Sequence, residues 1–407
     1  MSLNNLYHPK QVEVLRRAMT QDYFMLINHG AKRSGKTVLD NDLFLYELQR
    51  VRANATAAGV SNPQYVLAAA DIGSIHRNIL NELTGKYGIE FHFDKYNRFT
   101  LFGVQVCCFG HSKINDMGRI RGMTAWGAYI NEACVANEEV FDEIKSRCSG
   151  EGARILMDTN PAAPSHWLKT DYIDQADGKT IVEYPWRLDD NTFLSERYRQ
   201  SIKTSTPSGM FYDRDINGAW VSADGMVYAD FDARVHYIMA EQVPESRIQK
   251  WAVGVDFGWE HYGSMVLLGM DDTGCCYLVK DKATQHRHIA QWIEIGGRIQ
   301  ERLGKITFYC DSARPDLIEQ MWDAGLFAVK ARKSVISGIA DVASLFKQHR
   351  LLVVKDAAER FDKEIYGYVW KKNADEPVKV NDDVMDALRY AVEGILDDAG
   401  VSTGRRL

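Results

Sequence analysis

The chain has 407 residues, of which 45% are apolar and 26% are charged, with a formal net charge of −6. This composition is that of a globular protein and excludes a fully disordered chain, and the length suits two or three domains. The negative charge excludes a protein that is basic throughout, although a local basic groove can still bind nucleic acid.

Membrane, exported and disulfide-rich proteins are also disfavoured. No apolar run reaches the length of about eighteen residues that a membrane span needs. The polar residues 1–5 lack the pattern of a signal peptide, so we expect no export. Seven scattered cysteines without a C-x-x-C motif predict reduced thiols in a cytosolic protein.

The first half of the chain alternates short apolar runs with helical patterns. Strands are predicted at residues 23–28, 63–70, 99–109, 126–131 and 153–159, with helices at about 36–52, from 74, and at 138–147. Strands separated by helices predict βαβ units and a parallel sheet. The polar, turn-rich residues from about 189 to 246 follow this region. We therefore expect one domain at 1–205 and a connector at 206–246.

A second domain is predicted at 247–407. Strands at 251–256, 264–270 and 275–280 follow closely, with a tight turn at 271–274 between the last two. Helices at 286–303, after Pro315, at 336–349 and at 382–396 then alternate with strands at 306–310, 326–330 and 351–354. Three hairpin-linked strands followed by this alternation is the order of a ribonuclease H-like sheet.

Residues 30–37 match the phosphate-binding pattern G-x-x-x-x-G-K-[ST] between a predicted strand and a predicted helix. Glycines let backbone N–H groups surround phosphates, the lysine reaches the β- and γ-phosphates, and the hydroxyl binds Mg²⁺. A chance match is the alternative, which the strand and helix context disfavours. The predicted nucleotide-binding residues of this loop are Gly30, Lys32, Arg33, Ser34, Gly35, Lys36 and Thr37.

An ATP-hydrolysing site also needs a carboxylate at the end of another strand. The strand at 126–131 ends in Asn131 and continues with Glu132, which we predict as the catalytic carboxylate. Asn131 occupies the position where an acidic residue usually binds the metal. It carries no charge, so metal binding there would be weaker or water-mediated. A plain strand-to-helix cap is the alternative.

Two further predictions concern the same nucleotide. Gln11, before the first helix, could pair with an adenine edge, or it could belong to a solvated helix start. Thr159 and Asn160 end a strand in small polar groups, as expected of a γ-phosphate sensor, or they form an ordinary strand-ending turn.

The second domain carries a set of aspartates. Asp256 lies inside an apolar strand, Asp311 ends another strand expected to lie beside it, and Asp382, Asp383 and Asp386 open the last helix. Converging carboxylates form a site for Mg²⁺ or Mn²⁺, and two such ions support phosphodiester cleavage. Separate salt bridges, turns and helix caps are the alternative. Asp386 is the expected third ligand, with Asp383 as alternate.

Together these motifs, with residues 119–124, 165–167 and 218–220 between them, resemble the large terminase subunit of tailed bacteriophages and prophages. The resemblance implies an N-terminal P-loop (ASCE-type) ATPase, a C-terminal ribonuclease H-like two-metal nuclease, and an α/β fold. It implies that Thr159 and Asn160 form the coupling motif of the ATPase. It also implies that Arg121 is the arginine finger that acts on a neighbouring subunit, with Arg33 as a competing candidate that would act in cis.

The implied function is a viral DNA-packaging motor that translocates duplex DNA and cuts the concatemeric genome. The implied partners are double-stranded DNA, a small terminase subunit and the portal protein. We expect a monomer that forms a ring on the procapsid, located in the host cytoplasm and transiently at the portal vertex. The alternatives are a repair helicase–nuclease, for which the chain is too short, a nucleotide-dependent DNA-binding switch and a portal-docking adaptor.

Overall fold

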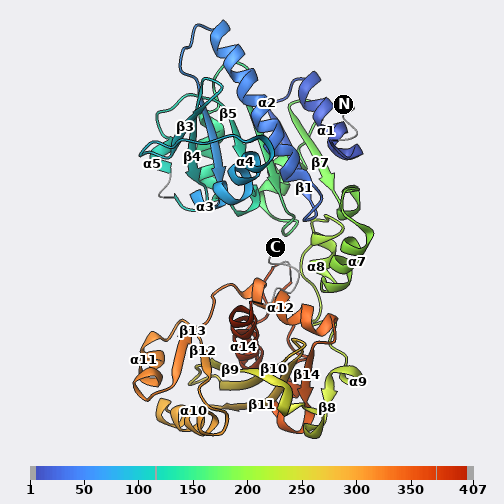
Figure 1. The fold of residues 1–407 in the computed structure, drawn as a ribbon, viewed down its shortest axis with the longest axis vertical. Coiled ribbons are helices and arrows are strands. Elements are labelled where there is room, and N and C mark those ends of the chain that lie inside the picture. Colours follow the sequence, from blue (N-terminus) through green and yellow to red (C-terminus); the bar gives the residue numbers. More distant parts are fainter. Residues whose placement is uncertain (1–5, 115–116, 373, 401–407) are drawn as a thin grey trace. The chain divides into compact units, whose positions relative to one another are not determined.

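The computed structural model describes residues 6–114, 117–372 and 374–400, which divide into two compact units (Figure 1). The first unit extends to Arg199 and includes Asp213–Val221, and the second takes Gln200–Tyr212 and the chain from Ser222. The predicted domain boundaries at residues 205 and 246 stay predictions, because a division into compact units does not establish which residues form a functional domain. Residues 1–5, on which the expectation of no export signal rests, lie outside the described residues.

The first unit is built on a seven-stranded sheet in the order β3-β4-β2-β5-β6-β1-β7. Neighbouring strands are parallel, except that β3 is antiparallel to β4. The predicted parallel sheet is therefore confirmed. The strands are β1 (Met25–Gly30), β2 (Gln64–Ala69), β3 (Arg98–Leu101), β4 (Val104–Gly110), β5 (Ala125–Ile130), β6 (Arg154–Thr159) and β7 (Ile181–Trp186).

The single strand predicted at residues 99–109 is wrong, because this stretch forms the two strands of a hairpin. Phe102 and Gly103 both have positive φ (52° and 75°) and form the turn between β3 and β4. The apolar run concealed the turn, since only one glycine marks it.

Helices cover both faces of this sheet, so alternate residues of a strand enter different cores. Leu26 of β1 packs with α2, whereas Met25 and Ile27 pack in the cluster that contains α6. This two-sided burial explains why the strands are apolar throughout. The helices are α1 (Pro9–Thr20), α2 (Lys36–Ala57), α3 (Ile72–Ile75), α4 (Asn81–Tyr87), α5 (Met117–Ile120) and α6 (Glu138–Arg147), and α7 (Glu196–Ser205) and α8 (Met210–Asp215) each have residues in both units.

The second unit has a seven-stranded sheet in the order β13-β12-β9-β10-β11-β14-β8. β9, β10 and β11 form the predicted antiparallel run, and β12 pairs with β9 in parallel, which confirms the ribonuclease H-like arrangement. The strands are β8 (Tyr237–Ile238), β9 (Ile248–Asp256), β10 (Gly263–Asp271), β11 (Cys276–Thr284), β12 (Thr307–Cys310), β13 (Phe327–Lys330) and β14 (Leu351–Val354).

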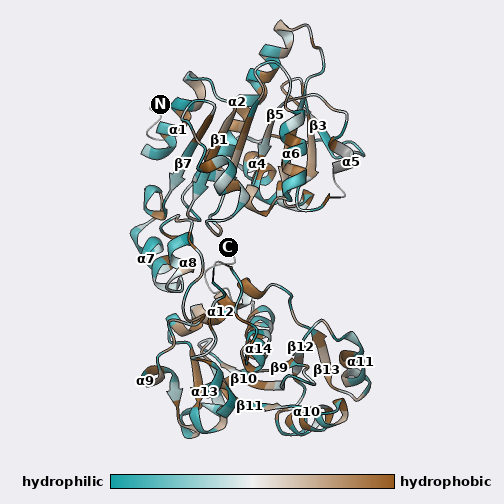
Figure 2. Ribbon diagram, turned by 180° about the vertical axis from the view of Figure 1, so that it is seen from behind, coloured by the Kyte–Doolittle hydropathy of each residue, from teal (hydrophilic) through white to brown (hydrophobic). Residues whose placement is uncertain are grey.

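Helices α10 and α11 pack on one face of this second sheet, around Val253, Phe308 and Trp292. Such helices carry hydrophobic and hydrophilic residues together, as α6 and α10 do in Figure 2. The helices of the unit are α9 (Ala233–His236), α10 (Ile289–Leu303), α11 (Pro315–Asp323), α12 (Val335–Lys347), α13 (Glu359–Glu364) and α14 (Asp383–Ala399). Within the described ranges, no helix combines the length and apolar character needed to cross a membrane.

Candidate ATPase and nuclease sites

The phosphate-binding loop joins the end of β1 to the start of α2. Gly30 has φ 138°, and a Cβ atom there would lie 2.1 Å from the carbonyl oxygen of Trp186. Arg33 and Gly35 also have positive φ, at 58° and 92°. Left-handed residues in such a turn let backbone N–H groups face one concave surface, which favours an anion at the N-terminus of α2. The loop therefore has the backbone shape that phosphate binding requires.

Lys36 is nearly fully buried behind this loop, with 5% of its surface exposed. Its ammonium group donates hydrogen bonds to the Ala31 carbonyl (2.9 Å) and to Oδ1 of Asn160 (2.8 Å). Burial lowers the pKa of Lys36 to about 8, although the nearby Asp158 carboxylate opposes the shift. Thr37 lies beside it in the first turn of α2 and is partly exposed.

Other loop residues are tied to the surrounding unit. Lys32 is exposed and forms a 3.3 Å ion pair with Asp215. The Arg33 carbonyl accepts a hydrogen bond from Asn191 (2.8 Å), and its side chain is exposed. Ser34 is buried, and its Oγ has no hydrogen-bond partner among the described residues. A buried unpartnered hydroxyl beside an anion-binding loop fits a site completed by a phosphate.

Gln11 lies against the phosphate-binding loop. Its side-chain amide donates to the Gly35 carbonyl (2.9 Å), and its Oε1 accepts from the His8 N–H (3.1 Å). The Nε2 atom of His8 lies 3.1 Å from the Ser34 carbonyl oxygen. Pairing with an adenine edge would thus require Gln11 to give up bonds that support the loop.

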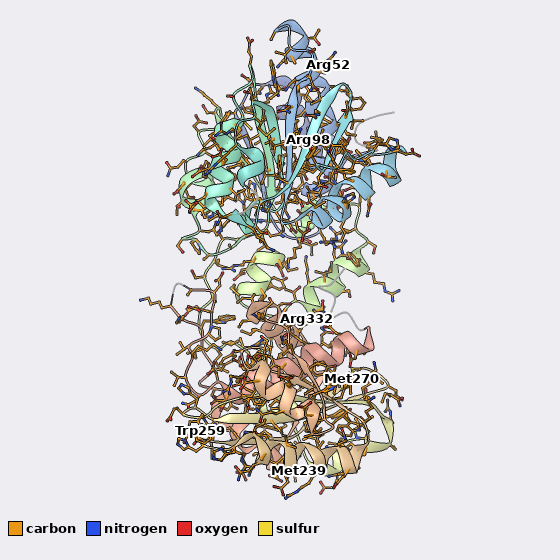
Figure 3. The ribbon with its side chains drawn as sticks, turned by 90° about the vertical axis from the view of Figure 1, so that its left-hand side faces the viewer. Arg52, Arg98, Met239, Trp259, Met270 and Arg332 are labelled. Atoms are coloured by element: carbon orange, nitrogen blue, oxygen red, sulfur yellow. The ribbon has the colours of Figure 1, made fainter. Side chains whose placement is uncertain are left out.

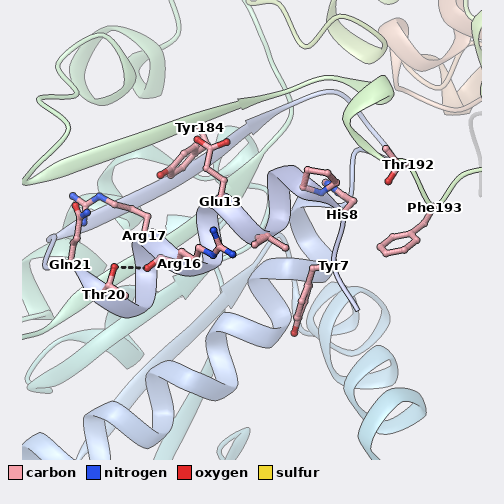
Figure 4. Close-up of a pocket in the computed structure, with 12 residues that line it drawn as sticks. Tyr7, His8, Glu13, Arg16, Arg17, Thr20, Gln21, Tyr184, Thr192 and Phe193 are labelled. Carbon is pink, nitrogen blue, oxygen red and sulfur yellow. Dashed lines mark hydrogen bonds between the residues drawn. The ribbon is translucent and has the colours of Figure 1, made fainter. Parts of the chain in front are cut away.

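A surface cavity of about 720 Å³ adjoins the loop through His8 (Figure 4). Arg16, Arg17 and Thr20 of α1 line it, and Thr20 donates a hydrogen bond to the Arg16 carbonyl. The ring of Phe193 lies 6.1 Å from that of His8, centroid to centroid. The cavity thus combines aromatic and basic side chains beside the phosphate-binding loop.

Glu132 follows β5 in a left-handed conformation, with φ 54° and ψ 51°. Burial, followed by the charge of Asp158, raises the pKa of Glu132. Asn131 is 1% exposed, and its amide donates to both oxygens of Asp158, at 2.9 and 3.0 Å. Asp158 was missed as a site residue by the sequence analysis. Its signal was a carboxylate inside the apolar strand β6, as for Asp256 in the other unit.

Thr159 and Asn160 contact both halves of the predicted ATPase site. Thr159 Oγ1 accepts a hydrogen bond from the N–H of Cys134 (3.0 Å), two residues after Glu132, and Asn160 binds Lys36. Arg121, by contrast, is exposed in the turn between α5 and β5. The described contacts do not link it to the phosphate-binding loop of its own chain.

In the second unit, Asp256 and Asp311 lie on the neighbouring strands β9 and β12. The Asp311 N–H donates to the Val255 carbonyl (2.9 Å), which places the two aspartates side by side. Gly254 brings α14 onto the same strand, since a Cβ atom there would lie 1.8 Å from the Ala387 carbonyl oxygen. Burial raises the pKa of Asp256 well above its usual range, and Asp386, Asp311 and Asp383 add to the shift. The structure therefore places Asp256 and Asp311 side by side, with Asp386 and Asp383 near enough to affect the pKa of Asp256.

Cations neutralise part of this acidic cluster. Lys379 lies 2.8 Å from Asp386 and 3.1 Å from Asp382, and Arg389 donates to Asp386 at 3.1 Å. Among the described residues, no three His, Cys, Asp or Glu side chains are arranged to hold a metal ion. The oxygen donors fit Mg²⁺ or Mn²⁺ chemically, but Asp386 is engaged by Lys379 and Arg389 in this arrangement.

Basic residues, which include Arg332 and Lys333, follow the end of β13. Arg332, labelled in Figure 3, forms an ion pair with Asp397 of α14 (2.5 Å). Arg332 thus contributes to holding α14, and Lys333 beside it is exposed.

The sequence model of the family described as "Terminase large subunit, T4likevirus-type, N-terminal" matches residues 29–234. That is about half of the chain, and it includes the phosphate-binding loop, Glu132 and Asn160. The chain belongs to this family.

Solved structures of large terminases extend the likeness beyond that half. The large terminase of a thermophilic bacteriophage is 25% identical, with a TM-score of 0.83 over 96% of this chain and 99% of that one. Its complexes with ADP and with ATP-γ-S, also 25% identical, give TM-scores of 0.81 and 0.80. The ADP complex covers 96% of this chain and all of that one, and the ATP-γ-S complex covers 95% and 98%. No curated protein matches the chain.

The predicted fold is thereby confirmed as an N-terminal P-loop ATPase followed by a ribonuclease H-like nuclease. This terminase-family chain is an ATPase and endonuclease of a viral DNA-packaging motor. The comparisons give no support to a DNA-binding switch or a docking adaptor.

Proposed function

We propose that ATP binds at residues 30–37 and is hydrolysed with Glu132 as the carboxylate that activates water. Lys36 would bind the β- and γ-phosphates, and Thr37 would hold Mg²⁺ with the phosphates. The observation that carries this proposal is the contact of Asn160 with Lys36 beside that of Thr159 with Cys134. Both ends of the site are thereby joined to one strand end.

The same contacts support a coupling role for Thr159 and Asn160. Loss of the γ-phosphate would change what Lys36 binds, and Asn160 and its neighbour Thr159 would transmit this change to the segment that follows β5. A ligand shifts a conformational equilibrium only through its differential contacts with the two states, and these contacts supply such a difference. Arg121, exposed and on the surface, suits action in a neighbouring subunit, whereas Arg33 would act in cis.

For cleavage, Asp256, Asp311 and Asp386 would hold Mg²⁺ or Mn²⁺, with Asp383 as the alternate to Asp386. Bound metal supplies Lewis-acid activation and stabilises the leaving oxygen of a phosphodiester. Lys379 and Arg389 would compete with a metal ion for the charge of Asp386. The nucleotide complexes of the thermophilic-phage large terminase support ATP as the cofactor of the first unit.

The partners belong to the same proposal. Duplex DNA would be the substrate of both activities, and a small terminase subunit and a portal protein would recruit the chain. The chain would act as a ring at the portal vertex and as a monomer in the host cytoplasm. Family membership supports DNA and packaging partners in general.

Two variants of the full-length chain test the two assignments. Glu132→Gln should abolish DNA-stimulated ATP hydrolysis while nucleotide still binds, and plasmid cleavage should persist. Asp256→Ala should abolish metal-dependent cleavage and leave ATP hydrolysis intact. Glu138→Gln and Asp272→Ala, at exposed positions of the same units, are matched controls. Loss of both activities in either variant would contradict the assignment of ATP hydrolysis to the first unit and of DNA cleavage to the second.

A further inference from the structure

The end of β5 lacks the charge that a P-loop ATPase usually places there. In such enzymes an acidic residue at this strand end holds the nucleotide's metal ion. Here the position is Asn131, whose amide is neutral. A carboxylate on a neighbouring element would restore the negative charge that this position lacks.

Asp158 lies one strand away in a position to supply that charge. β6 lies between β1 and β5, and Asp158 is paired in register with Asn28 of β1. Its side chain is 1% exposed. A buried carboxylate is costly unless hydrogen bonds compensate it, and Asp158 receives four of them. The donors are the Asn131 amide to both oxygens (2.9 and 3.0 Å), the Glu132 N–H (2.8 Å) and the Tyr129 hydroxyl (3.2 Å).

All these donors belong to the strand end that carries the predicted catalytic residue. Glu132 has a left-handed backbone conformation, which a residue with a Cβ adopts only when its surroundings impose it. The bond from the Glu132 N–H to Asp158 fixes the peptide that enters this conformation. Asn131 is further held from the opposite side by the Asn78 amide (2.9 Å).

We propose that Asp158 is a positioning residue of the ATPase site, which fixes Glu132 and supplies from β6 the negative charge that Asn131 lacks on β5. Asp158 acts through Asn131 and Glu132, without touching the reacting atoms itself. This inference rests on the proposed role of Glu132. The carboxylate thus lies on β6 instead of β5, hydrogen-bonded to the amide that occupies the β5 position.

An exchange of the two side chains tests this directly. Asp158→Asn removes the charge and places an amide nitrogen among groups that are already donors. Asn131→Asp places two carboxylates in contact, so that one must bind a proton. The double variant Asn131→Asp/Asp158→Asn restores one carboxylate and one amide in the same contact. Asp271→Asn in the second unit is the matched control, because Asp271 is a buried carboxylate with four hydrogen bonds of its own.

The readouts are kcat and KM for ATP in the presence of DNA, nucleotide affinity, and the unfolding temperature. Each single variant should lose about tenfold or more in kcat, with KM changed less than about threefold. The double variant should recover to within about threefold of wild type, and Asp271→Asn should keep wild-type kcat. If kcat is restored in the double variant but stays low in Asn131→Asp alone, the carboxylate can be moved from one strand to the other without loss of activity.

Two outcomes would overturn the inference. One is a wild-type kcat in Asp158→Asn. The other is an exchange variant that binds nucleotide and melts like wild type but still lacks turnover. If Asp158→Asn does not fold, the exchange variant decides by the same criteria. Glu132→Gln distinguishes failure of the proposed function from failure of this inference. If Glu132→Gln hydrolyses ATP normally, the proposed function fails. If Glu132→Gln is inactive while Asp158→Asn keeps its ATPase activity, only this inference fails.

Discussion

Lys36 combines a catalytic position with an unusual environment, because its ammonium group is buried and, among the described residues, hydrogen-bonds to a carbonyl and an amide oxygen and to no carboxylate. Burial lowers its pKa from 10.5 to about 8. A depressed lysine pKa means that the charge is present below about pH 8 and is lost as the pH rises through that value. Phosphate binding needs the charged form, so the nucleotide-free protein should lose affinity in mildly alkaline solution.

We expect the ATP dissociation constant to stay constant between about pH 7 and 7.5 and to rise by about tenfold per pH unit above pH 8. Calorimetric or fluorescent-nucleotide titrations across this range measure it. Lys36→Arg, whose guanidinium stays charged, should give weaker but pH-independent binding. An identical slope in both proteins would mean that another group titrates.

Lys379 is one of the cations that pair with the acidic cluster in the nuclease unit. Its ammonium group bridges Asp382 and Asp386, so it partly neutralises carboxylates that would otherwise attract a metal ion. The side chain is half exposed, which limits the energy of these pairs to roughly 1 kcal/mol.

Lys379→Ala should therefore lower the Mg²⁺ or Mn²⁺ concentration for half-maximal plasmid cleavage by about fivefold. Lys371→Ala is the matched control, since Lys371 pairs with Glu376 and not with the cluster. A higher metal requirement in Lys379→Ala would instead show that Lys379 helps to bind the DNA phosphate.

At the scale of elements, the contact of β9 with α14 forms the nuclease site. Gly254 permits it, because the backbone of α14 occupies the space of a side chain at that position. The nearest atoms are main-chain atoms of Ala387, which cannot move aside as a flexible side chain would. Asp386 lies on the same helix one residue earlier, so any shift of α14 moves a predicted ligand.

Gly254→Ala should destabilise the second unit by about 2 kcal/mol or more and abolish cleavage while ATP hydrolysis persists. Gly297→Ala in α10 is the control, because a Cβ atom there meets nothing within 4 Å. That change should stabilise the helix by about 0.5–1 kcal/mol. Thermal unfolding and plasmid cleavage measure both effects, and equal behaviour of the two variants would refute the close-approach argument.

At the scale of the whole molecule, the cysteines are distributed through the cores of both units. Cys107, Cys108, Cys148, Cys276 and Cys310 are buried, and Cys134 and Cys275 are half-buried. Burial raises the pKa of Cys107 to about 11 and that of Cys148 and Cys276 to about 12. Thiolates, the reactive form, are therefore scarce at neutral pH.

A thiol-reactive dye at about pH 7.5 should label at most Cys134 and Cys275 in the folded chain, and all seven cysteines after denaturation. Mass spectrometry of the labelled peptides identifies the sites. Burial raises the pKa of Cys134 to about 12, so Cys275 should react first. Rapid labelling of Cys148 or Cys276 would indicate that the corresponding core opens.

Much of the fold and part of each site were predictable because they depend on local spacing. The phosphate-binding pattern at residues 30–37 needs a strand, a turn and a helix in succession, and the chain provides them in that order. Asp256 was recognisable because a carboxylate in an apolar strand requires compensation. The β3–β4 hairpin was not recognised, since its turn is short and its strands form one apolar run.

The sequence by itself determined which chemical groups each unit carries and the order in which its strands and helices follow. Only the tertiary structure decided which of these groups touch: Asp158 with Asn131, Lys379 with Asp386, and Gln11 with Gly35. The physical reason is the strand order. β6 enters between β1 and β5 although it follows both in the chain, so its side chains meet partners that no local pattern connects to them.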